Sequence, residues 1–223
     1  MTLLHIVCEG QTEETFVRDV LIPALCPPLI VDYSLIETSP GHKGGGLSYP
    51  RVQRHLRNIL RESRAPITTT LFDLYRLDTG FPGYTEAAGK PLAQRLAVLN
   101  KAFHADMVSF AGCRPERFLP YFQPYEFEAL LFSDISRVVG LETNWAAAET
   151  PLQAVRDSAD SPEHINDSPA TKPAAHLKRH LTLPSYDKVL HGPIAASLIG
   201  FARMEQECHY FATWLASLRA LSN

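Results

Sequence analysis

The chain has 223 residues, of which 45% are hydrophobic, 20% charged and 9% aromatic. This composition excludes a disordered chain, and the length predicts one domain, or one domain with a substantial extension. The formal net charge of -3 excludes a globally basic nucleic-acid binder, although local basic patches remain compatible with it.

The amino-terminal half alternates between strand and helix patterns. Apolar runs of strand length cover residues 3–7, 29–36 and 67–72. Apolar side chains at helical spacing fill the segments between them, where Thr12 is a candidate cap for the first helix and Ser48 precedes the second. This order predicts an α/β fold with a parallel sheet and right-handed crossovers.

The remaining segments are expected to be more helical. The pattern predicts a helix over residues 91–104, a strand over 117–123 and a helical run over 125–134, followed by mainly helical segments between 194 and 221. We therefore expect an α/β core over residues 1–135 and a mainly helical extension over 136–223 that packs on the core.

Targeting signals and paired cysteines are not evident in the sequence. No apolar run approaches the roughly 18 residues that cross a bilayer, and the first ten residues lack the basic lead of a signal peptide. The four cysteines are far apart and form no CxxC pair, which favours free thiols. We expect a cytoplasmic protein with no membrane segment.

Acidic side chains follow two of the predicted strands. Glu9 comes after the first strand and Asp73 ends the third, and the carboxyl ends of parallel strands gather ligands. Mg²⁺ takes oxygen ligands, usually from one or two carboxylates together with waters and substrate phosphates. The candidate metal ligands are Glu9, Asp73, Asp78, Glu126 and Glu128, with Glu13 as a further acid. The alternative is that Glu13 only favours the helix dipole and Asp78 only caps a turn.

Basic side chains form two candidate phosphate-binding groups. The first is one face of the helix after Ser48, and the second is a later cluster. Arginine offers a planar fork of donors to phosphate, but a solvated helix face has the same pattern. The candidates are Arg51, Arg54, Arg57, Arg61 and Arg64 in the first group, and Lys178, Arg179 and Lys188 in the second.

Four stretches of the chain resemble a family of uncharacterised bacterial proteins with a TOPRIM-like fold. They are EGQTEE, TLFDLYRLDTGFPG, QPYEFEALLFSD and the long segment from INDSPATKP to SLIG. The resemblance implies that Glu9 is the first-motif glutamate, Asp73 the first acid of a DxD motif and Glu128 a later metal-binding glutamate, with Glu126 beside it. Tyr75 replaces the second acid of the DxD motif, and Asp78 is the only nearby substitute.

The resemblance implies a Mg²⁺- or Mn²⁺-dependent nuclease that acts on DNA or RNA, with Glu9, Asp73 and Glu128 as catalytic residues. Relatives of this kind work with ATPases in bacterial defence against phages, so an AAA-type ATPase is the expected partner. Two alternatives stay open. A non-catalytic adaptor would bind the ATPase without cleaving a substrate, and a phosphoesterase would use the same acids on a small molecule. The sequence does not fix the substrate or the oligomeric state.

Overall fold

The computed structural model describes residues 1–39, 42–43, 47–64, 66–165 and 168–222. Asn166 and Asp167, in the last of the four stretches above, lie outside the described residues. The chain forms two compact units, one of residues 1–122 with 219–223 and one of residues 123–218. The sequence placed its division at residue 135, whereas the units divide between Phe122 and Gln123.

The first unit is built on a parallel β-sheet of five strands flanked by helices, a Rossmann-like arrangement. Its strands follow the order β2-β1-β5-β6, and β7 also pairs with β5. The strands are β1 (Leu3–Cys8), β2 (Ile30–Leu35), β5 (Ile67–Asp73), β6 (Phe118–Leu119) and β7 (Phe122–Gln123), and the short pair β3 (Glu37–Ser39) and β4 (His42–Lys43) forms a separate antiparallel ribbon. The predicted fold class is therefore confirmed.

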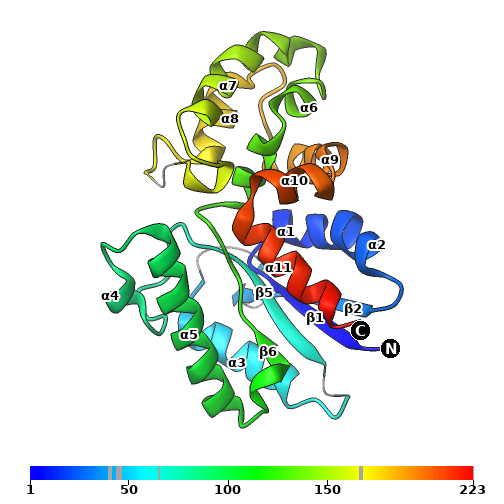
Figure 1. The fold of residues 1–223 in the computed structure, drawn as a ribbon, viewed down its shortest axis with the longest axis vertical. Helices are drawn as coiled ribbons and strands as arrows, with labels where there is room; N and C mark the ends of the chain where they lie inside the picture. The colour runs from blue at the N-terminus through cyan, green and yellow to red at the C-terminus, as the bar shows by residue number, and fades with distance from the viewer. Residues whose placement is uncertain (40–41, 44–46, 65, 166–167, 223) are drawn as a thin grey trace. The chain divides into compact units, whose positions relative to one another are not determined.

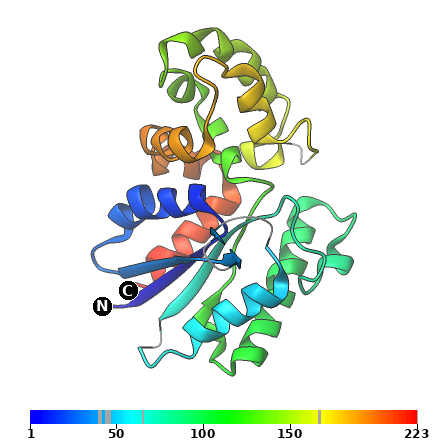
Figure 2. The same cartoon turned by 180° about the vertical axis from the view of Figure 1, so that it is seen from behind.

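Helices cover both faces of this sheet (Figures 1 and 2). The helical segments on one face are α1 (Gln11–Phe16), the π-helical turn η1 (Val17–Leu21) and α2 (Ile22–Leu25), and those on the other are α3 (Tyr49–Leu60) and α5 (Leu92–Ala111). The short helices α4 (Tyr84–Ala87) and η2 (Pro115–Arg117) complete the unit. Helices on both faces explain why β5 is an almost wholly buried run without alternation and why the last three residues of β1 are all buried.

An aromatic cluster fills the core between α5 and the sheet. The ring of Phe103 lies 5.3 Å from that of Phe81, 5.1 Å from Phe118 and 5.6 Å from Phe122, with edge-to-face or tilted geometry. Such pairs add about 0.5–1.5 kcal/mol each beyond the area that they bury. The cluster fixes α5 against β6. The strand predicted over residues 117–123 is present as two short strands, β6 and β7, which both pair with β5.

The second unit is helical and contains only the end of β7 from the sheet. Its helices are η3 (Phe127–Ser133), α6 (Ile135–Val139), η4 (Thr143–Ala148), α7 (Glu149–Asp157), η5 (Pro162–His164), α8 (Pro173–His180), α9 (Lys188–Ile199), α10 (Phe201–Glu207) and α11 (His209–Ala220). The segment predicted to be helical over 125–134 is a 3-10 helix, all seven residues of which are buried.

Of the two sequence expectations about helix starts, that for Thr12 is wrong and that for the position of Ser48 is confirmed. Thr12 was a candidate cap, but Gly10 occupies the cap position of α1 and Thr12 lies inside the helix, where its buried Oγ1 has no hydrogen-bond partner among the described residues. Ser48 does cap α3 by position, yet its side chain makes no capping hydrogen bond. The first N–H of α3 instead finds a distant acceptor, described below.

Candidate functional site

Glu9 and Asp73 meet at the carboxyl edge of the sheet. Strands β1 and β5 are direct neighbours, with Cys8 opposite Leu71, so the residues that follow these two positions emerge side by side. The backbone N–H of Asp73 donates a hydrogen bond to Oε2 of Glu9 at 2.9 Å, and the backbone N–H of Glu9 donates to the carbonyl of Leu71 at 3.3 Å. Two acids that are 64 positions apart in the chain are therefore joined at one place.

A third carboxylate, that of Glu13, adjoins the end of β1. Its Oε2 lies 3.2 Å from the point where a Cβ on Gly10 would sit, so a side chain at position 10 would press on it. Glu13 is 3% exposed, and the pKa of the neighbouring Cys8 thiol is raised well above its usual value by burial first and by the charges of Glu13 and Glu14 next. Glu13 and Glu14 thus bring two further carboxyl groups to the end of β1.

Two of the other candidate acids have structural partners. Asp78 accepts hydrogen bonds from the backbone N–H of Tyr49 at 2.8 Å and of Gly80 at 3.0 Å, and so caps α3 from a distant loop. Glu126 accepts from the backbone N–H of Ala174 at 3.1 Å and pairs with Lys172 at the start of α8. These contacts hold helix starts in place.

Glu128 is 3% exposed and lies in the first turn of η3. Glu126 and Glu128 belong to the second unit, while Glu9 and Asp73 belong to the first. The convergence of all four acids on one metal site therefore stays a prediction. Among the described residues, no cluster of three or more His, Cys, Asp or Glu side chains is arranged to hold a metal ion.

The candidate phosphate-binding side chains differ in their contacts within the protein and in their exposure. The Arg57 guanidinium lies 5.2 Å from the centre of the Phe110 ring, and Arg54 donates from Nε to the carbonyl of Pro50 at 3.2 Å. In the second unit, Arg179 donates to the carbonyl of Ala170 at 2.8 Å. Lys178, in the last turn of α8, and Lys188, at the start of α9, are exposed.

The sequence analysis missed a chain of polar side chains that links β1, β2 and α3. The Oγ of Ser34 lies 2.9 Å from Nε2 of His5 and 2.7 Å from Nε2 of His55. Asp32 extends the chain, with its Oδ2 3.7 Å from Nδ1 of His5. Burial lowers the pKa of His5, although the charge of Asp32 opposes this shift. The available signal was the period of two in β2, which places Asp32 and Ser34 on the same face.

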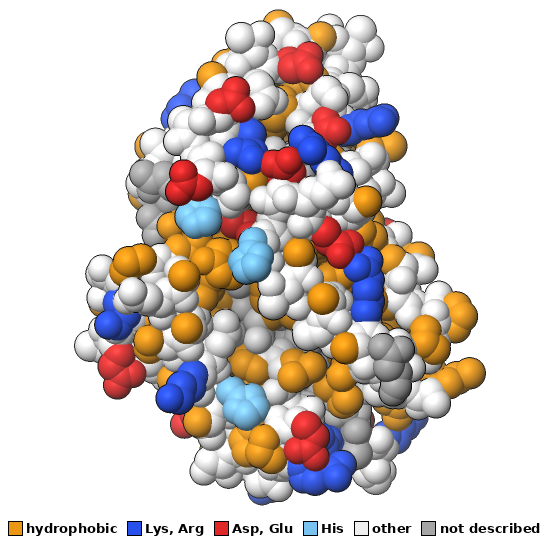
Figure 3. Space-filling model, viewed as in Figure 1, with side chains coloured by type: hydrophobic (Ala, Val, Ile, Leu, Met, Phe, Trp, Pro, Cys, Tyr) orange, Lys and Arg blue, Asp and Glu red, His pale blue; other side chains and the backbone are white. Residues whose placement is uncertain are grey.

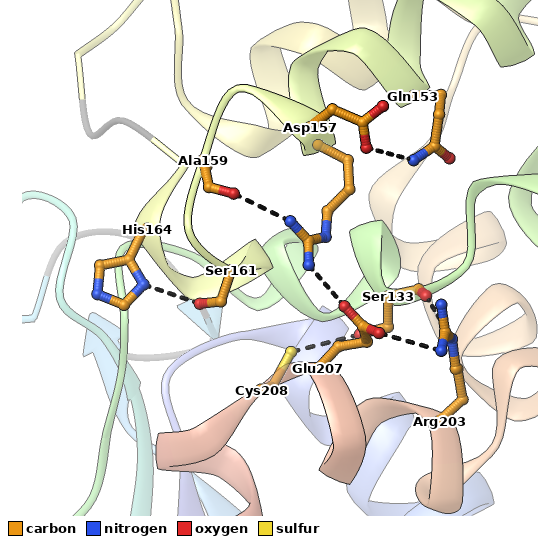
Figure 4. Close-up of polar contacts among 10 residues, drawn as sticks. Ser133, Gln153, Asp157, Ala159, Ser161, His164, Arg203, Glu207 and Cys208 are labelled. Atoms are coloured by element: carbon orange, nitrogen blue, oxygen red, sulfur yellow. Dashed lines mark hydrogen bonds and ion pairs between the residues drawn. The ribbon is translucent and has the colours of Figure 1, made fainter.

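A second network, of ion pairs, lies within the helical unit. Figure 4 shows the Glu207 carboxylate beside the guanidinium of Arg203 and close to Ser133. Glu207 pairs with Arg156 at 2.6 Å and with Arg203 at 3.0 Å, and Arg203 also donates to the carbonyl of Ser133 at 3.0 Å. Because each of its charged groups pairs with an opposite charge within the protein, this network is best explained as a brace between α7 and α10.

The face shown in Figure 3 carries charges of both signs. In the space-filling view of Figure 3, acidic and basic side chains are interspersed with apolar ones over the visible face. In the described part of the chain, no helix combines the length and the apolar character needed to span a membrane.

Fold and site together define a Rossmann-like α/β protein with acidic side chains at the carboxyl edge of its parallel sheet. Comparison with family models then identifies the chain as a member of the family called domain of unknown function DUF4276, which matches residues 8–219. Searches of curated proteins and of solved structures give no significant match.

Proposed function

We propose that this protein hydrolyses phosphodiester bonds of nucleic acid with a divalent cation, Mg²⁺ or Mn²⁺, held by Glu9 and Asp73. The observation that carries the proposal is the contact between these two residues at the ends of adjacent parallel strands. Ligands of open α/β sheets bind at that edge, which supports a reaction centre there.

The donor set fits a hard cation. Carboxylate oxygens are the ligands that Mg²⁺ prefers, and Mg²⁺ sites commonly use one or two carboxylates and complete their shell with waters and substrate phosphates. Glu9 and Asp73 each bring a carboxyl group to the ends of neighbouring strands, and Glu13 adds a third carboxyl group at the end of β1. Two protein carboxylates are sufficient for a Mg²⁺ site when the substrate itself supplies phosphate oxygens as ligands.

The chain's own residues have separate tasks in this proposal. A bound divalent cation lowers the pKa of water and neutralises charge on phosphoryl oxygens. Glu9, fixed by the Asp73 N–H, takes or returns a proton near the reacting group. Lys178, Arg179 and Lys188 contact the backbone of the nucleic acid.

The resemblance to TOPRIM proteins supports the same assignment. On that basis Glu9 is the first-motif glutamate, Asp73 the first acid of the DxD motif, and Glu128 a further ligand contributed by the second unit. We also propose that the protein acts in bacterial phage defence with an AAA-type ATPase.

The direct test is cleavage of labelled DNA and RNA by the purified protein with Mg²⁺ or Mn²⁺, alone and with its ATPase. Glu9→Gln and Asp73→Asn are each expected to lower the rate by about a hundredfold or more. Glu9→Gln keeps an acceptor for the Asp73 N–H, so the fold is retained. Glu86→Gln, at an exposed position of the same unit, is the matched control. Intact substrate with the wild-type protein under all conditions, or equal rates in all variants, contradicts the proposal.

A second candidate, an adaptor that binds the ATPase without catalysis, is favoured by an apolar row on α9. Leu190, Ile194 and Leu198 are 58%, 45% and 50% exposed and stand four residues apart, so they lie on the same side of the helix. Such a row suits the groove of a protein partner. Replacing all three by serine should abolish binding of the ATPase. Cleavage by the purified wild-type protein separates the candidates, because an adaptor cleaves neither DNA nor RNA with any divalent cation.

A further inference from the structure

A polar pocket of about 730 Å³ lies beside the edge strand β2 in the first unit. It is bordered by α1, β2 and the first two turns of α3, the elements that face the viewer in Figure 2. Neither Glu9 nor Asp73 lines it. The side chains that matter for the argument are Glu14, Asp32, Ser34, Arg51, Arg54 and His55.

Two arginines lie in the pocket wall and form no ion pair with any described residue. Arg51 and Arg54 are exposed, and neither forms an ion pair with any carboxylate among the described residues. They stand three residues apart on α3, so both guanidinium groups lie on one side of the helix. In the second unit, by contrast, Arg156 and Arg203 share the carboxylate of Glu207. No ion pair therefore keeps these two guanidinium groups from the phosphate group of a ligand.

The polar chain behind the pocket fixes the side chain of His55 in the pocket wall. A hydroxyl has one proton, so at least one of the two imidazoles that flank Ser34 must donate to its oxygen. This hydrogen bonding fixes His55, which also lines the pocket, against β2. The donors that the pocket offers to a phosphate are therefore the guanidinium groups of Arg51 and Arg54.

Two carboxylates in the same pocket restrict the class of ligand. Glu14 and Asp32 would repel a ligand that carries only negative charge, but they accept hydrogen bonds from hydroxyl and amino groups. A nucleoside phosphate has both kinds of group, since its phosphate suits Arg51 and Arg54 and its sugar and base carry hydrogen-bond donors. The pocket volume lies within the range of small-molecule sites, about 300–1,000 Å³.

We propose that the pocket formed by β2, α1 and α3 binds a nucleoside phosphate, with its phosphate on Arg51 and Arg54 and its sugar or base toward Glu14 and Asp32. This inference goes beyond the proposed function, because it uses different residues and needs no divalent cation. The ligand is either a free nucleotide or one nucleotide of a nucleic-acid strand.

The test is binding of adenosine monophosphate by calorimetry in the presence of EDTA, alongside adenosine, inorganic phosphate and a short RNA that begins with the same nucleotide. The nucleotide should bind more tightly than either of its parts. The double variant Arg51→Gln, Arg54→Gln should weaken its binding by about tenfold or more, because charge-assisted hydrogen bonds to phosphate are lost. The matched control is Arg64→Gln, which alters an exposed arginine beyond the end of α3.

The arms of the experiment separate the two sources of the ligand. Weakened binding of both the nucleotide and the RNA supports a site for free nucleotides, and weakened binding of the RNA alone supports a site for one unit of a strand. If the double variant binds both as the wild-type protein does, or if neither binds the wild-type protein, the inference is wrong. Glu9→Gln should leave this binding unchanged, so failure here is distinct from failure of the proposed hydrolase.

Discussion

The buried carboxyl group of Glu163 should make the free energy of unfolding depend on pH. Its side chain is fully buried, and its carboxylate accepts the backbone N–H groups of Tyr210 at 2.8 Å and Phe211 at 2.9 Å, in the first turn of α11. Burial raises its pKa from 4.5 to about 7, even though the two hydrogen bonds favour the charged form. Replacement by glutamine keeps an oxygen acceptor and removes the titration.

The sign and the size of the effect follow from this shift. Between pH 4.5 and about 7 the folded protein holds a proton on Glu163 that the unfolded chain releases, so the free energy of unfolding falls as the pH rises through this window. At 1.36 kcal/mol per pKa unit, the full effect is about 3 kcal/mol, and roughly 2.5 kcal/mol of it falls between pH 5 and pH 8. The Glu163→Gln variant should lack this fall.

Urea unfolding of the wild-type protein and the Glu163→Gln variant at pH 5 and pH 8 measures the effect. Other titrating groups are present in both proteins, so the difference between the two pH dependences isolates Glu163. Glu149→Gln, at an exposed position of the same unit, should behave like the wild-type protein. Equal pH dependence in the wild-type protein and the Glu163→Gln variant would refute the reasoning, because it would mean that Glu163 titrates alike in the folded and unfolded chain.

The remaining predictions concern a helix start and two glycines with positive φ. Asp78→Ala removes the acceptor for the Tyr49 N–H and should lower the free energy of unfolding by about 1 kcal/mol in urea titrations, whereas Asp78→Asn should recover most of it. Gly83→Ala should reduce the melting temperature more than Gly112→Ala, since both have positive φ but only at position 83 would the new Cβ lie 2.9 Å from that of Ala102. Equal losses for the two glycine variants would show that crowding against Ala102 adds nothing to the cost of the positive φ.

Much of the first unit could be predicted from the sequence because its signals are local. The apolar runs and the helical spacing before Asp73 identified three strands and two helices, and parallel pairing then placed Glu9 beside Asp73. The residue that caps α3 could not be predicted from such local patterns. Asp78 reaches Tyr49 across 29 positions, a contact that depends on the path of the intervening chain.

The second unit shows where periodicity fails. The run from Phe127 to Ser133 is buried on all sides, so its spacing does not distinguish the observed 3-10 helix from an α-helix. The polar pairs of this unit are also distant in sequence, with Glu163 capping α11 and Arg156 pairing with Glu207. Contacts of this kind depend on tertiary packing and leave no local pattern.

The central claim is that Glu9 and Asp73 together hold a divalent cation, and titration with Mn²⁺ tests it most directly. The account predicts binding by the wild-type protein and by Glu86→Gln, and a loss of affinity of about tenfold or more in both Glu9→Gln and Asp73→Asn. Folded variants that bind Mn²⁺ as tightly as the wild-type protein would contradict it.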